Sequence, residues 1–167
     1  RHHGSMYHYY LKAYKIMNKL NTNSIFVSVF GIGYIPFASG TFGSFAGIII
    51  GYLIYLINYN LLFLVIPILF ILGIKASDIY QNKTGEQDSK VIVIDEVVGQ
   101  LIAMLTVLDN FLLLFLSFLI FRFFDIVKPW PASFFDKNMK NGKGVMMDDV
   151  IAGIYSLIIL IIIEMCI

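Results

Sequence analysis

Positive charge is confined to three segments of this 167-residue chain, and that distribution constrains its fold more than any other feature. The twelve Lys and Arg residues lie in 1–19, 75–90 and 122–143, whereas the connections 58–60 and 109–110 and the tail carry none. Long apolar stretches separate these segments. Because cytoplasmic flanks of membrane spans carry an excess of Lys and Arg, we expect the three basic segments to share the cytoplasmic side.

The composition also favours a membrane protein. The chain is 59% hydrophobic and only 14% charged, which is more apolar than a soluble domain of this size. A membrane span needs roughly 20 apolar residues, and fewer where a helix end is buried in protein. We therefore predict an all-α, polytopic helical bundle with its N-terminus inside and its C-terminus outside. The five predicted spans are about 41–57, 61–74 extending past Ser77, 91–108, 111–124 and 150–164.

The chain divides into a short arm and one domain. Residues 1–5 resemble the remnant of an affinity tag and are set aside. In 6–23, aromatic and apolar residues recur at helical spacing opposite a lysine face, which predicts an amphipathic helix in the membrane interface. A soluble helix packed on the bundle is the alternative. Residues 24–167 form a single membrane-embedded domain, in which Ser24–Tyr34 is too short to span and dips into the membrane or lies against the bundle.

Five carboxylates are predicted to gather at the cytoplasmic end of the spans. Asp95 and Glu96 lie about one turn inside an apolar helix, Asp125 closes the fourth span, and Asp148 and Asp149 open the fifth. Ionised side chains at such depth cost several kcal/mol unless they are paired or bind a metal. An oxygen-only cluster of this kind suits a hard cation, above all Mg²⁺. The alternative is a pair of acids that reach from a helix end into water.

Two further segments contain residue types that bind phosphate. The glycine-rich loop 31–44 leads into the first predicted span, and its backbone N–H groups, with Thr41 and Ser44, could donate to an anion. Arg122 and Lys128 supply cations on either side of Asp125, before two prolines end the helix. The alternatives are structural: small residues for close helix packing, and an arginine that only neutralises the acids.

These motifs occur together, in order, in three blocks. The blocks are Gly33, Pro36, Gly40-Thr41 and Gly43-Ser44; then Asp88, Ile92 to Glu96 and Gly99; then Phe121-Arg122, Asp125, Lys128 to Pro131, Asp136, Gly142, Gly144 to Asp149 and Ala152-Gly153. From about residue 31 to residue 153, the chain resembles the phosphatidylglycerophosphatase A family of bacterial membrane enzymes. It departs from the family pattern at Ser39, where proline is common, and at Gln100, where methionine is usual.

The resemblance implies a Mg²⁺-dependent lipid phosphatase at the cytoplasmic face of the bacterial inner membrane. Such an enzyme removes the terminal phosphate of phosphatidylglycerophosphate and leaves phosphatidylglycerol, a step of phospholipid biosynthesis. Phosphoryl transfer requires neutralised phosphate charge and an activated nucleophile, and the residues provide both. We assign Mg²⁺ binding to Asp95, Glu96, Asp148 and Asp149, phosphate binding to Gly40, Thr41, Ser44, Arg122 and Lys128, and catalysis to Asp95, Glu96, Arg122, Asp125, Lys128 and Asp149.

Several alternatives stay open at this level. The acids are not divided into metal ligands and a general base, and an aspartyl-phosphate intermediate is as consistent as direct attack by water. A divalent-cation or proton transporter would also need intramembrane carboxylates, although here the outer halves of the spans are almost purely apolar. A head-group transferase would need a longer aspartate signature that is missing. The expected partners are an anionic phospholipid and the membrane, with no nucleic acid, and the sequence does not fix an oligomeric state.

Overall fold

The computed structural model describes residues 21–87 and 89–166, and every regular element in this part of the chain is helical. The predicted all-α class is therefore confirmed for these residues. The tag remnant and the predicted amphipathic helix fall almost wholly in residues 1–20, outside the described residues. The elements are α2 (Thr22–Val27), the 3-10 turn η1 (Ile32–Tyr34), α3 (Ser39–Ile57), α4 (Leu61–Thr84), α5 (Ile94–Ala103), α6 (Phe111–Val127), α7 (Ala132–Asn138) and α8 (Gly142–Cys166).

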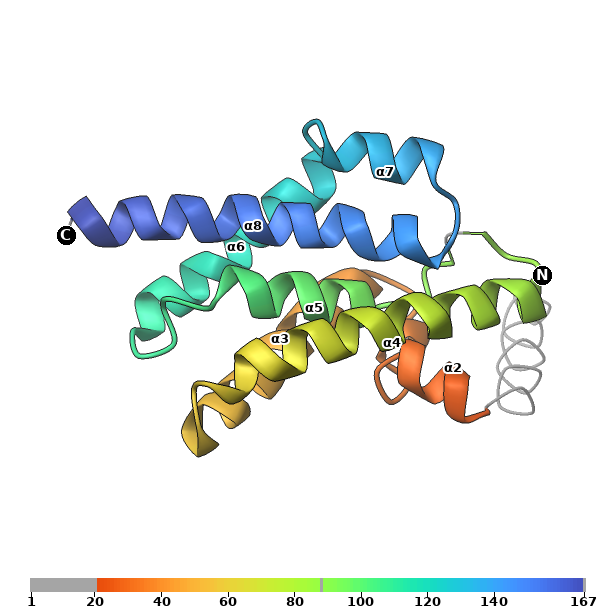
Figure 1. The fold of residues 1–167 in the computed structure, drawn as a ribbon, viewed down its shortest axis with the longest axis horizontal. Helices are drawn as coiled ribbons and strands as arrows, with labels where there is room; N and C mark the ends of the chain where they lie inside the picture. The colour runs from red at the N-terminus through yellow and green to blue at the C-terminus, as the bar shows by residue number, and fades with distance from the viewer. Residues whose placement is uncertain (1–20, 88, 167) are drawn as a thin grey trace, which may run out of the picture.

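The long helices run roughly alongside one another, so that the chain passes back and forth between two ends of the molecule (Figure 1). The connections after α3 and after α5 lie at the same end as the C-terminus (Figure 1). The end of α4 and the connection from α7 to α8 lie at the other end, where the second basic segment and much of the third are found. The predicted gathering of these two basic segments at one end of the bundle agrees with this arrangement.

Three helices, α3, α4 and α8, are long and apolar enough to cross a membrane. The prediction of five spans is not confirmed. Helix α5 has only ten residues, and at about 1.5 Å per residue it is about 15 Å long, half the thickness of a bilayer core. Helix α6 has seventeen residues. The apolar run 91–108 contains turn and irregular residues at both ends, so its hydrophobicity alone overstated the length of the helix.

Helix boundaries differ from the predicted spans mainly at the charged end. Helix α4 continues to Thr84, well beyond the apolar core of its span. Helix α8 begins at Gly142 rather than near residue 150, because Asp78 of α4 accepts a 2.6 Å hydrogen bond from the Gly142 N–H and satisfies one of its free donors. Helix α6 ends as expected, with Lys128 in a left-handed conformation (φ 46°) just before a proline.

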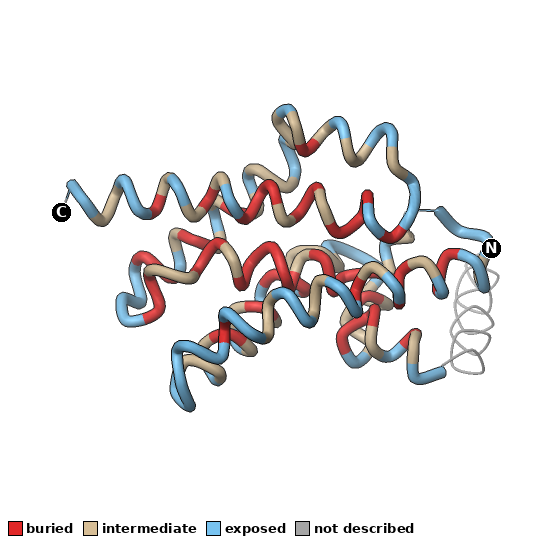
Figure 2. Tube along the Cα trace, viewed as in Figure 1, coloured by how far each residue is buried: buried red, intermediate tan, exposed pale blue. Residues whose placement is uncertain are grey.

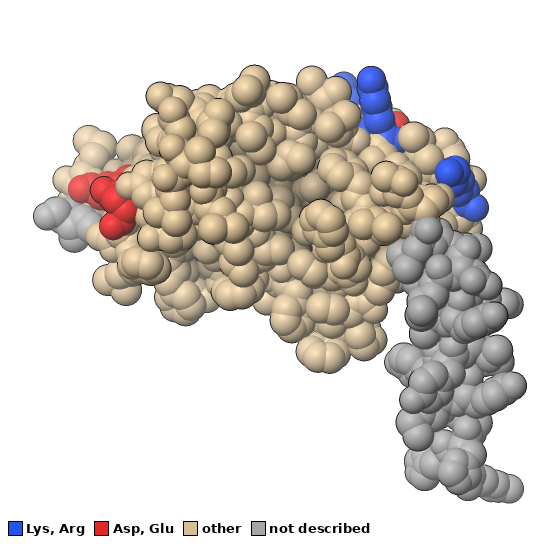
Figure 3. All heavy atoms as spheres, turned by 90° about the horizontal axis from the view of Figure 1, so that it is seen from below, with Lys and Arg blue, Asp and Glu red and all other residues tan. Residues whose placement is uncertain are grey.

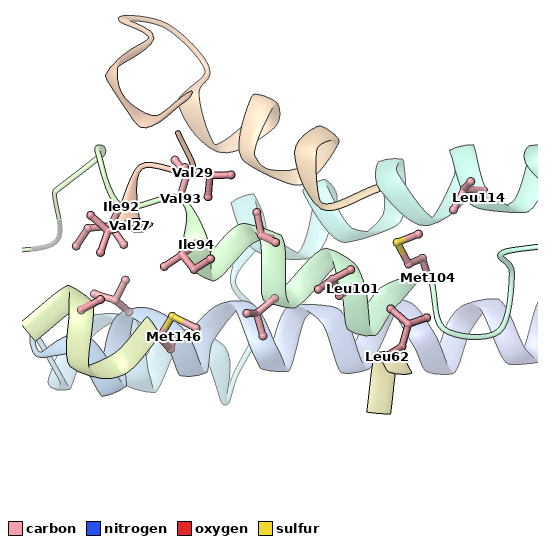
Figure 4. Packing of buried hydrophobic residues seen from close by; sticks show 14 of the residues in the cluster. Val27, Val29, Leu62, Ile92, Val93, Ile94, Leu101, Met104, Leu114 and Met146 are labelled. Carbon is pink, nitrogen blue, oxygen red and sulfur yellow. The ribbon is translucent and has the colours of Figure 1, made fainter. Parts of the chain in front are cut away.

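Helix α5 is the centre of the bundle. It packs mainly against α8 and α3, and eight of its ten residues are buried. At the crossing of α5 and α8, a Cβ on Gly153 would collide with the backbone carbonyl of Gly99, so the close approach requires glycine. Buried apolar residues around α5 form one large cluster, of which Figure 4 shows Ile94, Leu101 and Met104 with partners from neighbouring helices.

The outside of the bundle is apolar. Many large hydrophobic side chains on α3, α4, α6 and α8 are exposed, among them Leu53, Phe63, Phe115 and Ile162. Buried residues instead concentrate on the inward sides of the helices (Figure 2). In the face shown in Figure 3, a wide region without charged side chains separates acidic residues at one end from basic residues at the other. This pattern is the one expected of a helical membrane protein.

The segment before α3 lies against the bundle, which is one of the two arrangements predicted for Ser24–Tyr34. The side-chain amide of Asn23 in α2 donates a 2.9 Å hydrogen bond to the carbonyl of Ala76 in α4. Val27, at the end of α2, is fully buried, and its carbonyl accepts a 2.9 Å hydrogen bond from the N–H of Val93. This contact fixes the irregular segment that leads into α5 and therefore the point at which α5 begins.

Candidate active site

Asp95 and Glu96 lie in the first turn of α5, not one turn inside it as the sequence suggested. The preceding residue Val93 bonds to α2 and takes a non-helical conformation, so the helix begins only at Ile94. The position suits two acids, since the N-terminus of a helix carries partial positive charge. The side chain of Asp95 also accepts a 3.1 Å hydrogen bond from the N–H of Glu96.

Asp148 and Asp149 lie well inside α8, where they are only 6% and 3% exposed. This depth differs from the prediction that they open the helix, and it follows from the early start of α8 at Gly142. Adjacent helical residues point about 100° apart, and these two aspartates take different partners. Asp149 lies with Asp95 and Glu96, whereas Asp148 forms an ion pair with Lys128.

Asp95, Glu96 and Asp149 form a compact group of oxygen donors. One carboxylate oxygen from each lies within 4.8 Å of the other two, which is close enough for one ion to contact all three. The Oε2 atom of Glu96 is buried and has no hydrogen-bond partner in the described part of the chain. Asp95 and Asp149 are buried and Glu96 is partly buried, and three such close carboxylates repel one another unless a cation or protons offset their charge. The donor set fits a hard divalent cation, and Asp148 is not part of it.

Arg122 lies beside this carboxylate group. Its Nη1 atom is 2.5 Å from Oδ2 of Asp125, one turn later in α6, and 3.4 Å from the hydroxyl of Ser44 in α3. Gly40 completes the contact, because a Cβ at that position would overlap Oε1 of Glu96 and crowd the Arg122 guanidinium. Asp125 therefore orients the arginine, and Gly40 leaves room for the Glu96 carboxylate and the Arg122 guanidinium.

Lys128 is held by two carboxylates. Its Nζ atom is 2.5 Å from Oδ2 of Asp148 and 2.8 Å from Oδ1 of Asp136 in α7. Burial lowers the pKa of the Lys128 ammonium, but the attraction of Asp148 and the hydrogen bond to Asp136 outweigh burial and raise it above its usual range. The same hydrogen bond lowers the pKa of Asp136. This lysine therefore stays charged, and its contacts link α6, α7 and α8.

The acids and cations border an open cavity of about 340 Å³. Of the predicted site residues, the structure places Gly40, Asp95, Glu96, Arg122, Asp125, Lys128, Asp148 and Asp149 on its wall. Thr41 and Ser44, further along α3, do not line it, and the Ser44 hydroxyl donates to the Gly40 carbonyl at 2.9 Å. The predicted glycine-rich loop is helical from Ser39 onward.

Sequence reasoning missed part of the wall. Ala38, Ser39, Ser89, Lys90 and Ile92 also line the cavity. A weak signal was present in the sequence, because Ser89 and Lys90 lie just before the buried Asp95 and Glu96. Gln100, one turn after Glu96 in α5, does not line the cavity, and its amide donates to the hydroxyl of Ser117 at 3.1 Å.

Comparisons with known proteins found relatives that cover most of this chain. Phosphatidylglycerophosphatase A of Haemophilus influenzae is 36% identical over 90% of this chain and 93% of its own length. The Bacteroides thetaiotaomicron protein named "Putative phosphatidylinositol-3-phosphatase" is 41% identical over 78% of this chain and 86% of its own length. Escherichia coli phosphatidylglycerophosphatase A is 36% identical over 76% of this chain and 74% of its own length.

No solved structure matches the chain. The model of one protein family, described as phosphatidylglycerophosphatase A, matches residues 25–164, which include every residue that lines the cavity. The resemblance stated from the sequence blocks is thereby confirmed, and the chain belongs to the phosphatidylglycerophosphatase A family of phosphatases.

Proposed function

We propose that this protein hydrolyses the terminal phosphate of phosphatidylglycerophosphate and releases phosphatidylglycerol and inorganic phosphate. The observation that carries the proposal is the group formed by Asp95, Glu96 and Asp149, which opens on the cavity with Arg122 beside it. Membership of a family named for this activity supports the choice of substrate. The apolar exterior of the bundle supports a substrate that is itself a lipid.

Asp95, Glu96 and Asp149 would hold the divalent cation, for which we propose Mg²⁺. The ion, when bound, would supply positive charge that offsets the charge on the phosphate oxygens. The initial assignment of Asp148 to the metal is replaced in this proposal by a positioning role, because its carboxylate is engaged by Lys128. The buried Oε2 atom of Glu96, which has no hydrogen-bond partner in the described part of the chain, supports direct binding of an ion by this residue.

Arg122 would contact a non-bridging oxygen of the phosphate. Its guanidinium borders the cavity next to the carboxylates, and Asp125 holds it there through a 2.5 Å ion pair. In the reaction, a bond forms from the attacking water oxygen to phosphorus while the bond to the glycerol oxygen breaks. The water gives up a proton to a cavity carboxylate, and the glycerol oxygen takes one.

We also propose a place for the site in the membrane. The chain would cross the bacterial inner membrane five times, with the short α5 shielded from lipid by α3, α6 and α8. The cavity end of the bundle would face the cytoplasm, since it carries the basic segments. Exposed apolar side chains reach close to that end on α3 and α6, including Phe42 and Phe123. The substrate would then enter sideways from the inner leaflet.

The test is hydrolysis by the purified protein in detergent or nanodiscs. We expect phosphatidylglycerol and inorganic phosphate in equal amounts, loss of activity with EDTA and recovery with Mg²⁺. Phosphatidylinositol 3-phosphate serves as a competing substrate because a relative carries that name. Asp149→Asn is the inactive control. Faster hydrolysis of the inositol lipid would overturn the choice of substrate, and Mg²⁺ flux in proteoliposomes without lipid hydrolysis would overturn the enzyme assignment.

A further inference from the structure

The charges on the cavity wall do not balance in pairs. Five acids and three cations line it, namely Asp95, Glu96, Asp125, Asp148 and Asp149 with Lys90, Arg122 and Lys128. Two of the cations already have carboxylate partners: Arg122 pairs with Asp125, and Lys128 pairs with Asp148. The other three acids form the candidate metal group. Among the described residues, Lys90 is therefore the lining cation whose ammonium has no carboxylate partner.

The backbone holds Lys90 at the wall even though the residue is exposed. The hydroxyl of Ser39, at the start of α3, donates a 3.0 Å hydrogen bond to the Lys90 carbonyl. On the other side, the N–H of Ile92 donates to the Ser89 carbonyl at 2.9 Å and forms a turn. The first N–H groups of α3 have no side-chain cap next to this turn, and they add partial positive charge to the same part of the wall.

The proposed substrate carries two phosphates, and the site described so far provides for one. Its terminal phosphomonoester is removed, while the phosphodiester that joins glycerol to diacylglycerol keeps a negative charge throughout. Resting on the proposed function, we propose that Lys90 is a specificity-determining residue, whose ammonium binds the phosphodiester while the carboxylate group and Arg122 act on the phosphomonoester. The protein would thereby favour lipids with both groups over phosphatidic acid, which has only the phosphomonoester.

The test compares two lipids and four forms of the protein. Parent, Lys90→Ala, Lys90→Arg and Lys83→Ala are assayed in nanodiscs on phosphatidylglycerophosphate and on phosphatidic acid. Lys83 is the matched control, because it is an exposed lysine in the last turn of α4 that does not line the cavity. We expect Lys90→Ala to lower the ratio of kcat/KM for phosphatidylglycerophosphate to kcat/KM for phosphatidic acid about tenfold, as for loss of one charged contact. The change should come mainly from a higher KM for phosphatidylglycerophosphate. Lys90→Arg should keep most of the parent's preference.

A binding measurement keeps the inference separate from the proposed function. In an Asp149→Asn background, which suppresses turnover, native mass spectrometry gives the affinity for each lipid with and without Lys90→Ala. A parent that hydrolyses neither lipid would refute the proposed function, while a selective loss of phosphatidylglycerophosphate affinity would still support the diester contact. An equal loss for both lipids, or the same loss in Lys83→Ala, would overturn the proposal, because the lysine would then act on the shared phosphate or on the membrane surface.

Discussion

Lys128 and Asp148 form an ion pair with an Nζ to Oδ2 distance of 2.5 Å, and this pair joins the end of α6 to the interior of α8. Asp148 is 6% exposed, so its charge depends on the lysine for compensation. The arrangement separates two adjacent aspartates by function. Asp149 belongs to the candidate metal group, whereas Asp148 ties α8 to the end of α6 through Lys128.

Lys128→Ala should therefore destabilise the protein as well as weaken its activity. It leaves the buried Asp148 without its partner, and we expect the free energy of unfolding to fall by about 2–3 kcal/mol, at the low end for a buried pair because the lysine side chain is 28% exposed. Thermal unfolding in detergent measures the change. The double variant Lys128→Met/Asp148→Asn should recover most of the stability. If the double variant is less stable than either single variant, the pair does not have this role.

Asp136, the second partner of Lys128, should make the stability of the protein depend on pH. The lowered pKa of Asp136 means that this carboxylate is more acidic in the folded state than in the unfolded state. Its contribution to the free energy of unfolding is therefore fully present above its ordinary pKa of about 4. The contribution is lost as the pH falls through the lowered folded-state value. Asp136→Asn should accordingly lower the melting temperature at pH 7. The substitution should have progressively less effect as the pH falls below about 4. An equal effect of the substitution at pH 7 and at pH 3 would contradict the ion pair.

Much of the site could be predicted from the sequence because its residues belong to segments whose depth is set by hydrophobicity. The apolar runs placed the acids at one end, and the basic segments placed Arg122 and Lys128 at that end too. The family resemblance added the substrate class.

The remaining features depend on contacts between distant segments. Asp78 extends α8 toward its N-terminus, and Val27 sets where α5 begins, so the depths of both acidic pairs were beyond local reasoning. Which aspartate faces the metal group and which faces Lys128 depends on the rotation of α8, which no spacing rule fixes. The length of α5 was beyond local reasoning for the same reason, because an apolar run is equally hydrophobic whether it is helical throughout or, as around α5, only in part.

Removing charge from the metal group should separate catalysis from stability. Asp95→Asn and Asp149→Asn preserve side-chain size, and we expect each to reduce lipid-phosphate hydrolysis by at least about 100-fold, the effect of losing a major charge-stabilising group. Mg²⁺ should raise the melting temperature of the parent but not of these variants. Asp109→Asn, at an exposed position in another connection, is the control. Parent-like, Mg²⁺-dependent turnover in both variants would refute their assignment as metal ligands.

The crossing of α5 and α8 offers a test of packing close to the site. In Gly153→Ala, the new methyl group meets the Gly99 carbonyl, which belongs to backbone and has little freedom to move. We expect a loss of about 1–3 kcal/mol in the free energy of unfolding, together with reduced activity, because the shift of α8 also displaces Asp149. Ile154→Ala, next along the helix and 42% exposed, should change both much less. Unchanged melting and turnover in Gly153→Ala would show that the helices are not in such close contact.

The proposed topology can be tested with single cysteines in a Cys166→Ser background. Ser77 is unsuitable as a probe because it is fully buried, whereas Lys83, Asn138 and Asn60 are exposed. If the basic end of the bundle faces the cytoplasm, Lys83→Cys and Asn138→Cys should react with an impermeant thiol reagent only after the membrane is opened. Asn60→Cys, at the opposite end, should react in intact spheroplasts. Labelling of position 138 from outside, with position 60 protected, would reverse the orientation and place the cavity on the outer face.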